Sequence, residues 1–278
     1  MVPCLRLELK RAFTSKGMLF ALLFACLLAT HHFIVDILDA TSGMAGFASE
    51  AALHAAMNFS PDFIWMHWMP ADAYSFHGYL YFLLLPLLAG LPHAGSLLRD
   101  RADHYAQVIC TRVSRGTYLC SKWIATFVSG GVVAVVPCAL SFLLLLTRYP
   151  VINPVAGAGH QVAQPTSMFA ELYMMQPLAW VALWLGILFV AGGVLATLGL
   201  AVTYITEYGL IVHVLPFLLL YVLTTVFTAL GCGTVSPLTI IDPSRNVGCP
   251  FWLLALEFGL LACAGAIPLA VDARREAQ

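Results

Sequence analysis

The sequence predicts an all-α integral membrane protein with six transmembrane helices, and three observations lead to this fold class. Of the 278 residues, 61% are hydrophobic and only 10% are charged, whereas roughly a quarter of the residues of a soluble domain are charged. Six apolar runs are each long enough to cross the hydrocarbon core as a helix, which takes about 20 residues. Basic residues gather on one side of these runs. No internal repeat and no soluble segment interrupts the pattern, so we expect residues 1–278 to form a single transmembrane domain.

The six expected spans are separated by charged or turn-rich segments. They lie near residues 17–38, 77–98, 119–147, 178–204, 208–230 and 250–271. In the fourth span, Gly192 and Ala196 form a small-xxx-small pair that allows close contact with another helix.

The distribution of lysine and arginine predicts the orientation. All but Arg148 and Arg245 flank the spans on the side that holds both chain ends. Positive charge stays in the cytoplasm, so we expect a multi-pass protein of the cell membrane with both termini and the segment 99–118 inside. The formal net charge of -1 gives no indication of a nucleic-acid partner.

Residues 1–16 are expected to form a helix that lies in the membrane interface before the first span. Leu5, Leu9 and Phe13 recur at helical spacing and form an apolar stripe. The remaining faces carry Arg6, Glu8, Lys10 and Arg11. Basic side chains beside an apolar stripe suit a helix that contacts lipid headgroups. The alternative is that this segment is only the solvated start of the first span.

The segment between the second and third spans carries the largest cluster of charge. We expect a cytoplasmic helix with one apolar face, formed by Leu98, Ala102, Tyr105 and Ile109. The charged residues around this face are Arg99, Asp100, Arg101, Asp103 and Arg112. A helix with this pattern is predicted to dock onto a soluble partner, and the alternative is a solvated helical hairpin. Glu207, in the tight turn between spans four and five, is predicted to be a second contact with that partner.

Three segments are expected outside. Residues 39–76 are predicted to hold a short helix on the outer leaflet, with Trp65 and Trp68 in the interfacial aromatic belt. Residues 148–177 form a loop with a short helix near 167–175.

The last outer segment, residues 231–249, mixes glycine and proline with apolar residues and suits a re-entrant hairpin. Cys232 and Cys249 flank it, so that a disulfide is possible there. Two packed free thiols are the alternative that we favour.

The sequence contains no recognisable catalytic motif. It has no GxxxxGK[ST], no HExxH, no GxSxG and no cysteine or histidine spacing typical of metal sites. We therefore expect no enzymatic activity, no metal and no cofactor on this chain itself.

Glu257 lies inside the sixth span, where an ionisable residue tends to face a cavity or the helix bundle. It is predicted to contact a translocation path or gate, or else to be a hydrogen-bonded packing residue. His93 and His213 lie near the inner ends of spans two and five, and a facing pair of this kind would be needed for haem. A membrane enzyme or a haem- or metal-handling protein therefore stays open as an alternative, although interfacial polar side chains are the default.

Local sequence resembles the permeases of ABC type-2 exporters, which are common in Gram-positive bacteria. Leu7-Glu-Leu-Lys-Arg-Ala-Phe-Thr-Ser-Lys is similar to the elbow helix of the family. Leu91-Pro-His-Ala-Gly-Ser-Leu-Leu-Arg-Asp-Arg, Thr111-Arg-Val-Ser-Arg and Tyr118-Leu-Cys-Ser-Lys-Trp-Ile-Ala are similar to its loop and to the start of its third span. These motifs are typical of the family rather than diagnostic, and the detailed likeness covers mainly 5–35 and 76–131.

The resemblance implies the six-span exporter fold and a set of partners. A second permease, identical or homologous, would pair with this chain, and an ATPase subunit that binds ATP and Mg would sit beneath it. The residues implied as contacts of a coupling helix are Arg99, Asp100, Arg101, Asp103, Tyr105 and Arg112.

The resemblance does not identify the exported substrate, although an apolar path mildly favours an amphipathic one. A secondary transporter is the third alternative, but such proteins usually show inverted repeats and broken helices, and the sequence shows neither.

Overall fold

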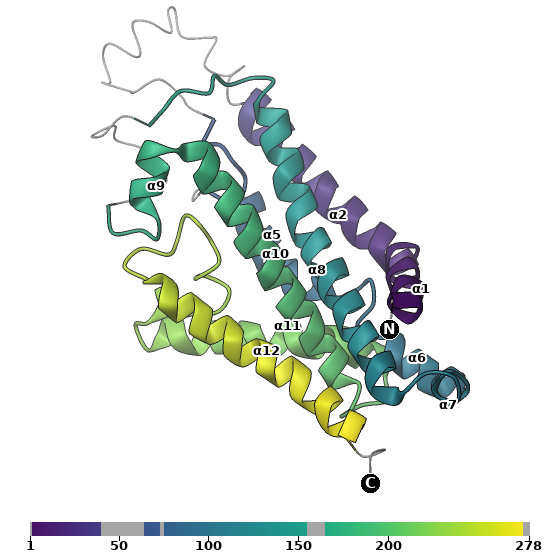
Figure 1. Ribbon diagram of the computed structural model, residues 1–278. Coiled ribbons are helices and arrows are strands. Elements are labelled where there is room, and N and C mark those ends of the chain that lie inside the picture. Colours follow the sequence, from purple (N-terminus) through teal and green to yellow (C-terminus); the bar gives the residue numbers. More distant parts are fainter. Residues whose placement is uncertain (1, 40–63, 73–74, 155–164, 275–278) are drawn as a thin grey trace, which may run out of the picture.

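The computed structural model describes residues 2–39, 64–72, 75–154 and 165–274, and these are helical with irregular connections (Figure 1). No strand forms in these ranges, apart from an isolated bridge between Ser167 and Val247. The helices are α1 (Val2–Phe13), α2 (Lys16–His32), the π-helix η1 (Phe33–Asp39), α5 (Phe76–Gly90), α6 (Ser96–Ala102), α7 (Tyr105–Cys110), α8 (Arg115–Leu145), α9 (Ala170–Met175), α10 (Pro177–Val202), α11 (Gly209–Ala229), the 3₁₀ turn η2 (Gly233–Val235) and α12 (Phe251–Arg274).

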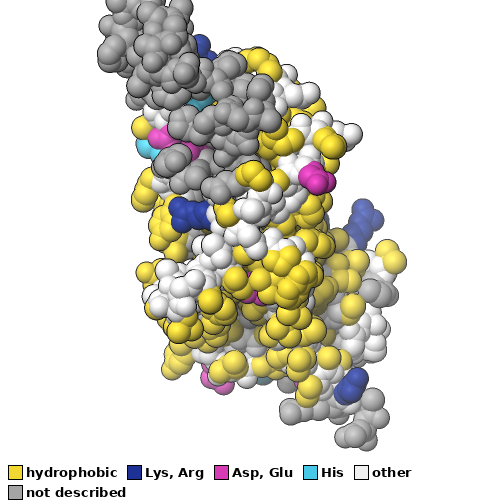
Figure 2. Space-filling model, turned by 90° about the vertical axis from the view of Figure 1, so that its left-hand side faces the viewer, with side chains coloured by type: hydrophobic (Ala, Val, Ile, Leu, Met, Phe, Trp, Pro, Cys, Tyr) yellow, Lys and Arg dark blue, Asp and Glu magenta, His cyan; other side chains and the backbone are white. Residues whose placement is uncertain are grey.

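Five of these helical segments are long and apolar enough to cross a membrane. They are Lys16–Leu38, Arg115–Leu145, Pro177–Val202, Gly209–Ala229 and Phe251–Arg274. Each agrees with an expected span to within a few residues, so the chain is an all-helical, multi-pass membrane protein. Hydrophobic side chains accordingly cover much of the described surface in Figure 2.

The second expected span, 77–98, is shorter than predicted. The helix α5 has 15 residues and ends at Gly90, and turns follow before α6 begins at Ser96. Pro92 contributes to this end, because proline has no N–H to donate to the helix, and Leu91 before it donates to the carbonyl oxygen of Leu88, three residues back instead of four. The apolar residues that follow Gly90 misled the prediction, since they continue the hydrophobic run without continuing the helix.

The middle of the molecule is built on the close contact between α8 and α10, which run side by side in Figure 1. A Cβ atom added to Gly192 would lie 2.5 Å from the Cβ of Ala134 and 2.8 Å from the carbonyl oxygen of Gly130. Ala196 contacts the same stretch of α8 at Gly130. The predicted small-residue pair therefore lies where two backbones approach most closely.

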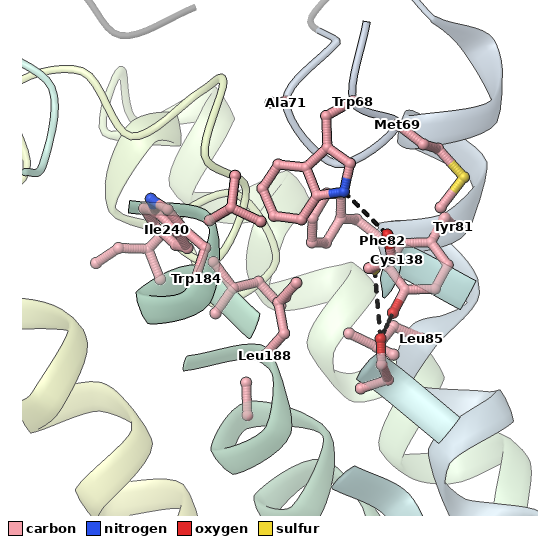
Figure 3. Close-up of a cluster of buried hydrophobic side chains, with 14 of the residues drawn as sticks. Trp68, Met69, Ala71, Tyr81, Phe82, Leu85, Cys138, Trp184, Leu188 and Ile240 are labelled. Atoms are coloured by element: carbon pink, nitrogen blue, oxygen red, sulfur yellow. Dashed lines mark hydrogen bonds between the residues drawn. The ribbon is translucent and has the colours of Figure 1, made fainter. Parts of the chain in front are cut away.

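An aromatic core packs around Trp68 (Figure 3). Trp65 and Trp68 are fully buried in it, and the Nε1–H of Trp68 donates to the carbonyl oxygen of Cys138 at 2.9 Å. The prediction that these tryptophans lie in an interfacial belt is therefore wrong. An interfacial tryptophan and a core tryptophan have the same sequence signature, and only tertiary packing distinguishes them. Residues 40–63, which hold most of the expected outer-leaflet helix, lie outside the described residues.

The segment 231–249, which was predicted to lie outside, consists of turns and η2, and no helical hairpin forms there. Its apolar residues Leu238, Ile240 and Ile241 are buried in the aromatic core. The short helix expected near 167–175 is present as α9.

Candidate functional site

A buried network of charged side chains connects three helices at the end of the molecule where both termini lie (Figure 1). Lys122 on α8 is its centre: its Nζ lies 3.1 Å from Glu8 Oε2 and 2.8 Å from Asp100 Oδ2. Glu8 belongs to α1 and Asp100 to α6, and all three side chains are almost inaccessible to solvent. Because removing charges from water is costly, such groups persist only when they are paired.

The remaining members of this network complete the pairing. Arg11 Nη2 lies 2.6 Å from Asp100 Oδ1, and Arg11 Nη1 lies 3.0 Å from Glu8 Oε1. Tyr118 donates its hydroxyl to Asp100 Oδ2 at 2.6 Å. The two cations therefore balance the two carboxylates, and each carboxylate also contacts both cations. Three polar side chains, His93, Ser96 and Tyr118, add hydrogen bonds to these pairs. We call the whole set the buried charge network: Glu8, Arg11, His93, Ser96, Asp100, Tyr118 and Lys122.

The pKa values of the carboxylates show that pairing outweighs burial. Burial would raise the pKa of Asp100, but the hydrogen bond from Arg11 and the charge of Lys122 lower it to about 2. Burial opposes ionisation of Glu8 in the same way, yet His93, Lys122 and Arg11 hold its pKa below the usual value. Burial lowers the pKa of His93, which favours the neutral imidazole. Both carboxylates are therefore ionised at neutral pH.

A second cluster joins the end of α12 to α6 and α8. Asp272 accepts from Arg115 at 2.6 Å and from the Tyr204 hydroxyl at 2.9 Å. Arg101 Nη2 lies 3.6 Å from the same carboxylate, and its guanidinium stacks over the Tyr204 ring at 4.3 Å. A cleft of about 540 Å³ opens beside these groups, between α7 and α8. Two membrane-capable helices, α8 and α12, and the turn that follows α10 thus converge on the segment that carries α6 and α7.

The segment expected to form one helix is two short helices at an angle (Figure 1). α6 ends at Ala102, and His104 adopts a left-handed conformation with φ of 56° before α7 begins. Leu98, Tyr105 and Ile109 are half-buried, whereas Ala102 is exposed. The break at His104 changes the direction of the chain between α6 and α7. The four residues predicted to share one apolar face therefore do not lie on one continuous helix. A left-handed backbone conformation at a residue other than glycine is hard to predict from sequence, although histidine adopts this conformation more often than most residues do.

The predicted partner contacts divide into two groups. Arg99, Asp103, Arg112 and Glu207 are exposed and free to meet another protein. Tyr105 is half-buried, with the Arg11 guanidinium 5.0 Å from its ring centroid, and Arg101 is held by the Asp272 cluster. Asp100 is 2% exposed and belongs to the interior, so its prediction as a surface contact is wrong. Its neighbours Arg99 and Arg101 are also charged, and neither is buried, which is why the sequence pattern alone did not distinguish Asp100 from them.

The amino-terminal helix packs on the rest of the chain through a face other than the predicted apolar stripe, and its placement in the membrane interface stays a prediction. Its buried face is Cys4, Glu8 and Ala12, whereas Leu5 and Leu9 are half-buried and Phe13 is exposed. Lys10 points to solvent, as expected, but Glu8 and Arg11 bind other helices. The face that the protein covers thus combines one charged residue, Glu8, with the small residues Cys4 and Ala12.

Sequence reasoning missed the central role of Lys122, which was counted only as one more basic residue on the inner side. The available signal is its position three residues inside the predicted third span, where a lysine requires a partner. The roles of Asp272 and Tyr204 were also missed, because the residues that they contact are distant in sequence.

The other predicted positions do not join these clusters. Glu257 on α12 is half-buried, and its Oε2 atom is buried without a hydrogen-bond partner among the described residues. Cys232 is exposed and Cys249 is buried, and both are free thiols, so the possible disulfide is not formed. His93 is bound to Glu8, and Nδ1 of His213 has no hydrogen-bond partner in the described part of the chain. Within the same residues, no group of three or more histidine, cysteine, aspartate or glutamate side chains is arranged to hold a metal ion.

No protein-family model, curated protein or solved structure matches this chain.

Proposed function

We propose that this chain is the membrane-spanning permease subunit of an ATP-driven ABC exporter. It lies in the cell membrane with both ends in the cytoplasm, pairs with a second permease, and works with a separate ATPase subunit that binds ATP and Mg. The residue that carries the proposal is Lys122, because its two ion pairs tie the amino-terminal helix and α6 directly to the long helix α8.

The mechanical argument starts from what a docking segment must do. A partner that binds and hydrolyses a nucleotide moves the surface it touches, and the membrane helices respond only if that surface is rigidly joined to them. α6 is joined to α1 and α8 through Asp100, and to α12 through Arg101 and Asp272. A loop that only connects two spans in water needs no such bracing, because buried ion pairs add little stability of their own.

The exposed side chains next to these braces, together with the half-buried Tyr105, form the proposed contact surface. Arg99 and Asp103 lie on and just after α6, Arg112 follows α7, and Tyr105 opens α7. Glu207, between α10 and α11, is the second proposed contact. Asp100 and Arg101 are proposed as braces that hold this surface, and not as contacts.

The experiment is to express the chain with the genes adjacent to its own and to record native mass spectra in mild detergent. Two permease chains with two copies of a soluble P-loop ATPase would support the proposal, and the permease masses would separate a homodimer from a heterodimer. A chain that carries no ATPase when the neighbouring products are present would contradict it.

Coupling is tested by replacing exposed contacts. Arg99→Ala combined with Arg112→Ala is expected to reduce the ATPase rate of the assembled complex by about tenfold, since two contacts of an interface are lost. Arg148→Ala is the matched control, because this exposed arginine is predicted to lie on the outer side. Equal ATPase rates for the double variant and the control would contradict the proposed contact surface.

A further inference from the structure

Apart from the buried charge network and the Asp272 cluster, a third group of ionisable side chains lies at the end of the molecule opposite to both, where η1 follows α2 and α5 begins. His31 Nδ1 lies 2.7 Å from His77 Nε2, and His77 Nδ1 lies 2.8 Å from Asp36 Oδ2. The Ser75 hydroxyl donates to the same carboxylate at 2.9 Å. These contacts form a hydrogen-bonded chain, His31–His77–Asp36. It joins α2 and η1 to α5, and its two histidines are 46 residues apart in the sequence.

The positions of the protons in this chain follow from the contacts. The Nδ1–H of His77 donates to Asp36, which is an acceptor, so Nε2 of a neutral His77 can only accept. His31 must then donate its Nδ1–H to His77. Both imidazoles are neutral in this state, and every contact pairs one donor with one acceptor.

One added proton is accommodated without losing a contact. A charged His77 donates from both ring nitrogens, to Asp36 on one side and to His31 on the other. His31 accepts at Nδ1 once its own proton occupies Nε2. The charge of His77 also faces the carboxylate of Asp36, which strengthens that pair.

A second added proton cannot be accommodated in this geometry. Two charged imidazoles present N–H groups to each other across 2.7 Å, without an acceptor between them. Two like charges at this distance also repel each other. The contact between the outer ends of α2 and α5 must then open.

We propose that the His31–His77–Asp36 chain is a proton-sensing clasp that holds α2 to α5 at neutral pH and releases them in acid. The inference does not depend on the proposed function, because it concerns a contact within the chain. The π-helix η1 lies next to the clasp, and π-helical turns are frequent at functional sites.

Other ionisable groups face the same region and must be separated from the clasp. His32 Nε2 lies 3.7 Å from Asp36 Oδ2 and 3.5 Å from Asp72 Oδ2. Beside α5, Arg245 lies over the Tyr79 ring and pairs with Asp242, and burial raises the pKa of Asp242 to about 6. Among the described helices that pack on α2 and α5, the halves of α8, α10 and α11 nearest the clasp add no charged group. The titratable side chains in these halves and elsewhere on α2 and α5 are Cys26, Tyr79, Tyr81, Cys138 and Tyr221.

The test is hydrogen–deuterium exchange of the purified chain at pH 7.5 and pH 5.0, corrected for the intrinsic rate at each pH. Peptides that cover residues 30–38 and 75–82 are expected to exchange about tenfold faster at the lower pH, as when one hydrogen bond to a charged group is lost. His31→Asn is expected to abolish the increase, because an amide near the Nδ1 position can donate or accept but cannot become charged.

Two controls distinguish the clasp from its surroundings. Asp242→Asn removes a buried carboxyl whose pKa is raised to about 6, and His104→Asn removes an exposed histidine at the opposite end of the molecule. Both are expected to keep the wild-type response. The proposal is overturned if wild-type exchange is the same at both pH values, if His31→Asn responds like wild type, or if Asp242→Asn abolishes the response.

Discussion

Lys122 Nζ lies 2.8 Å from Asp100 Oδ2, and neither side chain is more than 2% exposed. The pair joins α8 to the short helix α6 across a boundary that the sequence presents as a span next to a polar loop. The buried charge network is therefore part of the protein core, although nearly all of its members are residue types that usually lie on a surface.

Replacing Lys122 by Met should strongly destabilise the chain. The substitution leaves Glu8 and Asp100 buried with a single cation, Arg11, and breaking a buried pair in this way costs about 3–5 kcal/mol. A lower thermal midpoint of the purified protein in detergent would show this. Lys10→Met is the control, because Lys10 is exposed on α1.

The double variant Lys122→Met with Glu8→Gln should be more stable than Lys122→Met alone. Removing one charge of each sign leaves the Arg11–Asp100 pair balanced, so part of the loss is recovered. A double variant that is less stable than Lys122→Met would show that the network is not balanced by charge.

Acid should weaken the chain through Asp100. The pKa of this carboxyl is about 2 in the folded protein and lies near 3.8 when unperturbed. The stabilisation, about 2 kcal/mol, is fully present above pH 3.8 and is lost as the pH falls from 3.8 to 2. Thermal midpoints measured across this range should fall more steeply for the wild type than for Asp100→Asn, which has no carboxyl to protonate. Parallel curves for the two proteins would argue against this assignment.

Gly192→Ala should destabilise the contact between α8 and α10. Its new Cβ would meet the Cβ of Ala134 at 2.5 Å, so the helices must separate or shift, at about 1–3 kcal/mol. Gly186→Ala on the same helix is the matched control, since its Cβ would find nothing within 4 Å. The control should be neutral or slightly stabilising, because alanine favours helix. Equal unfolding midpoints for the two variants would contradict the packing described for Gly192.

Trp68→Phe should cost about 1–2 kcal/mol, because it removes the hydrogen bond to Cys138 and leaves a small void in the aromatic core. Trp252→Phe is the comparison, since Trp252 is 64% exposed. The unfolding midpoints in detergent measure both effects. If Trp68→Phe were no less stable than Trp252→Phe, the interior position of Trp68 would be in doubt.

Long apolar runs were the part of the fold that the sequence predicted well. Each of the five long helical segments agrees with an expected span, since about 20 apolar residues between polar segments have few other stable arrangements in a membrane. The errors have local causes: α5 ends early, just before Pro92, and His104 divides the segment that carries α6 and α7 into two helices.

The candidate site was predictable only in outline. The density of charged residues identified the segment that carries α6 and α7 as a candidate site. It could not show that Asp100 is buried whereas Arg99 beside it is exposed. That difference depends on Arg11 and Lys122, which reach Asp100 from two other helices. Pairings of this kind leave no regular spacing in one sequence.

The glycine-lined contact between α8 and α10 also limits which parts of the chain are able to move. Interlocked backbones such as those at Gly130 and Gly192 separate only at a large cost, so α8 and α10 must travel as one rigid body. α11 and α12 are covered far less by the rest of the chain, with most of their large apolar side chains exposed. Any rearrangement of helices within this chain therefore has to leave the contact between α8 and α10 closed.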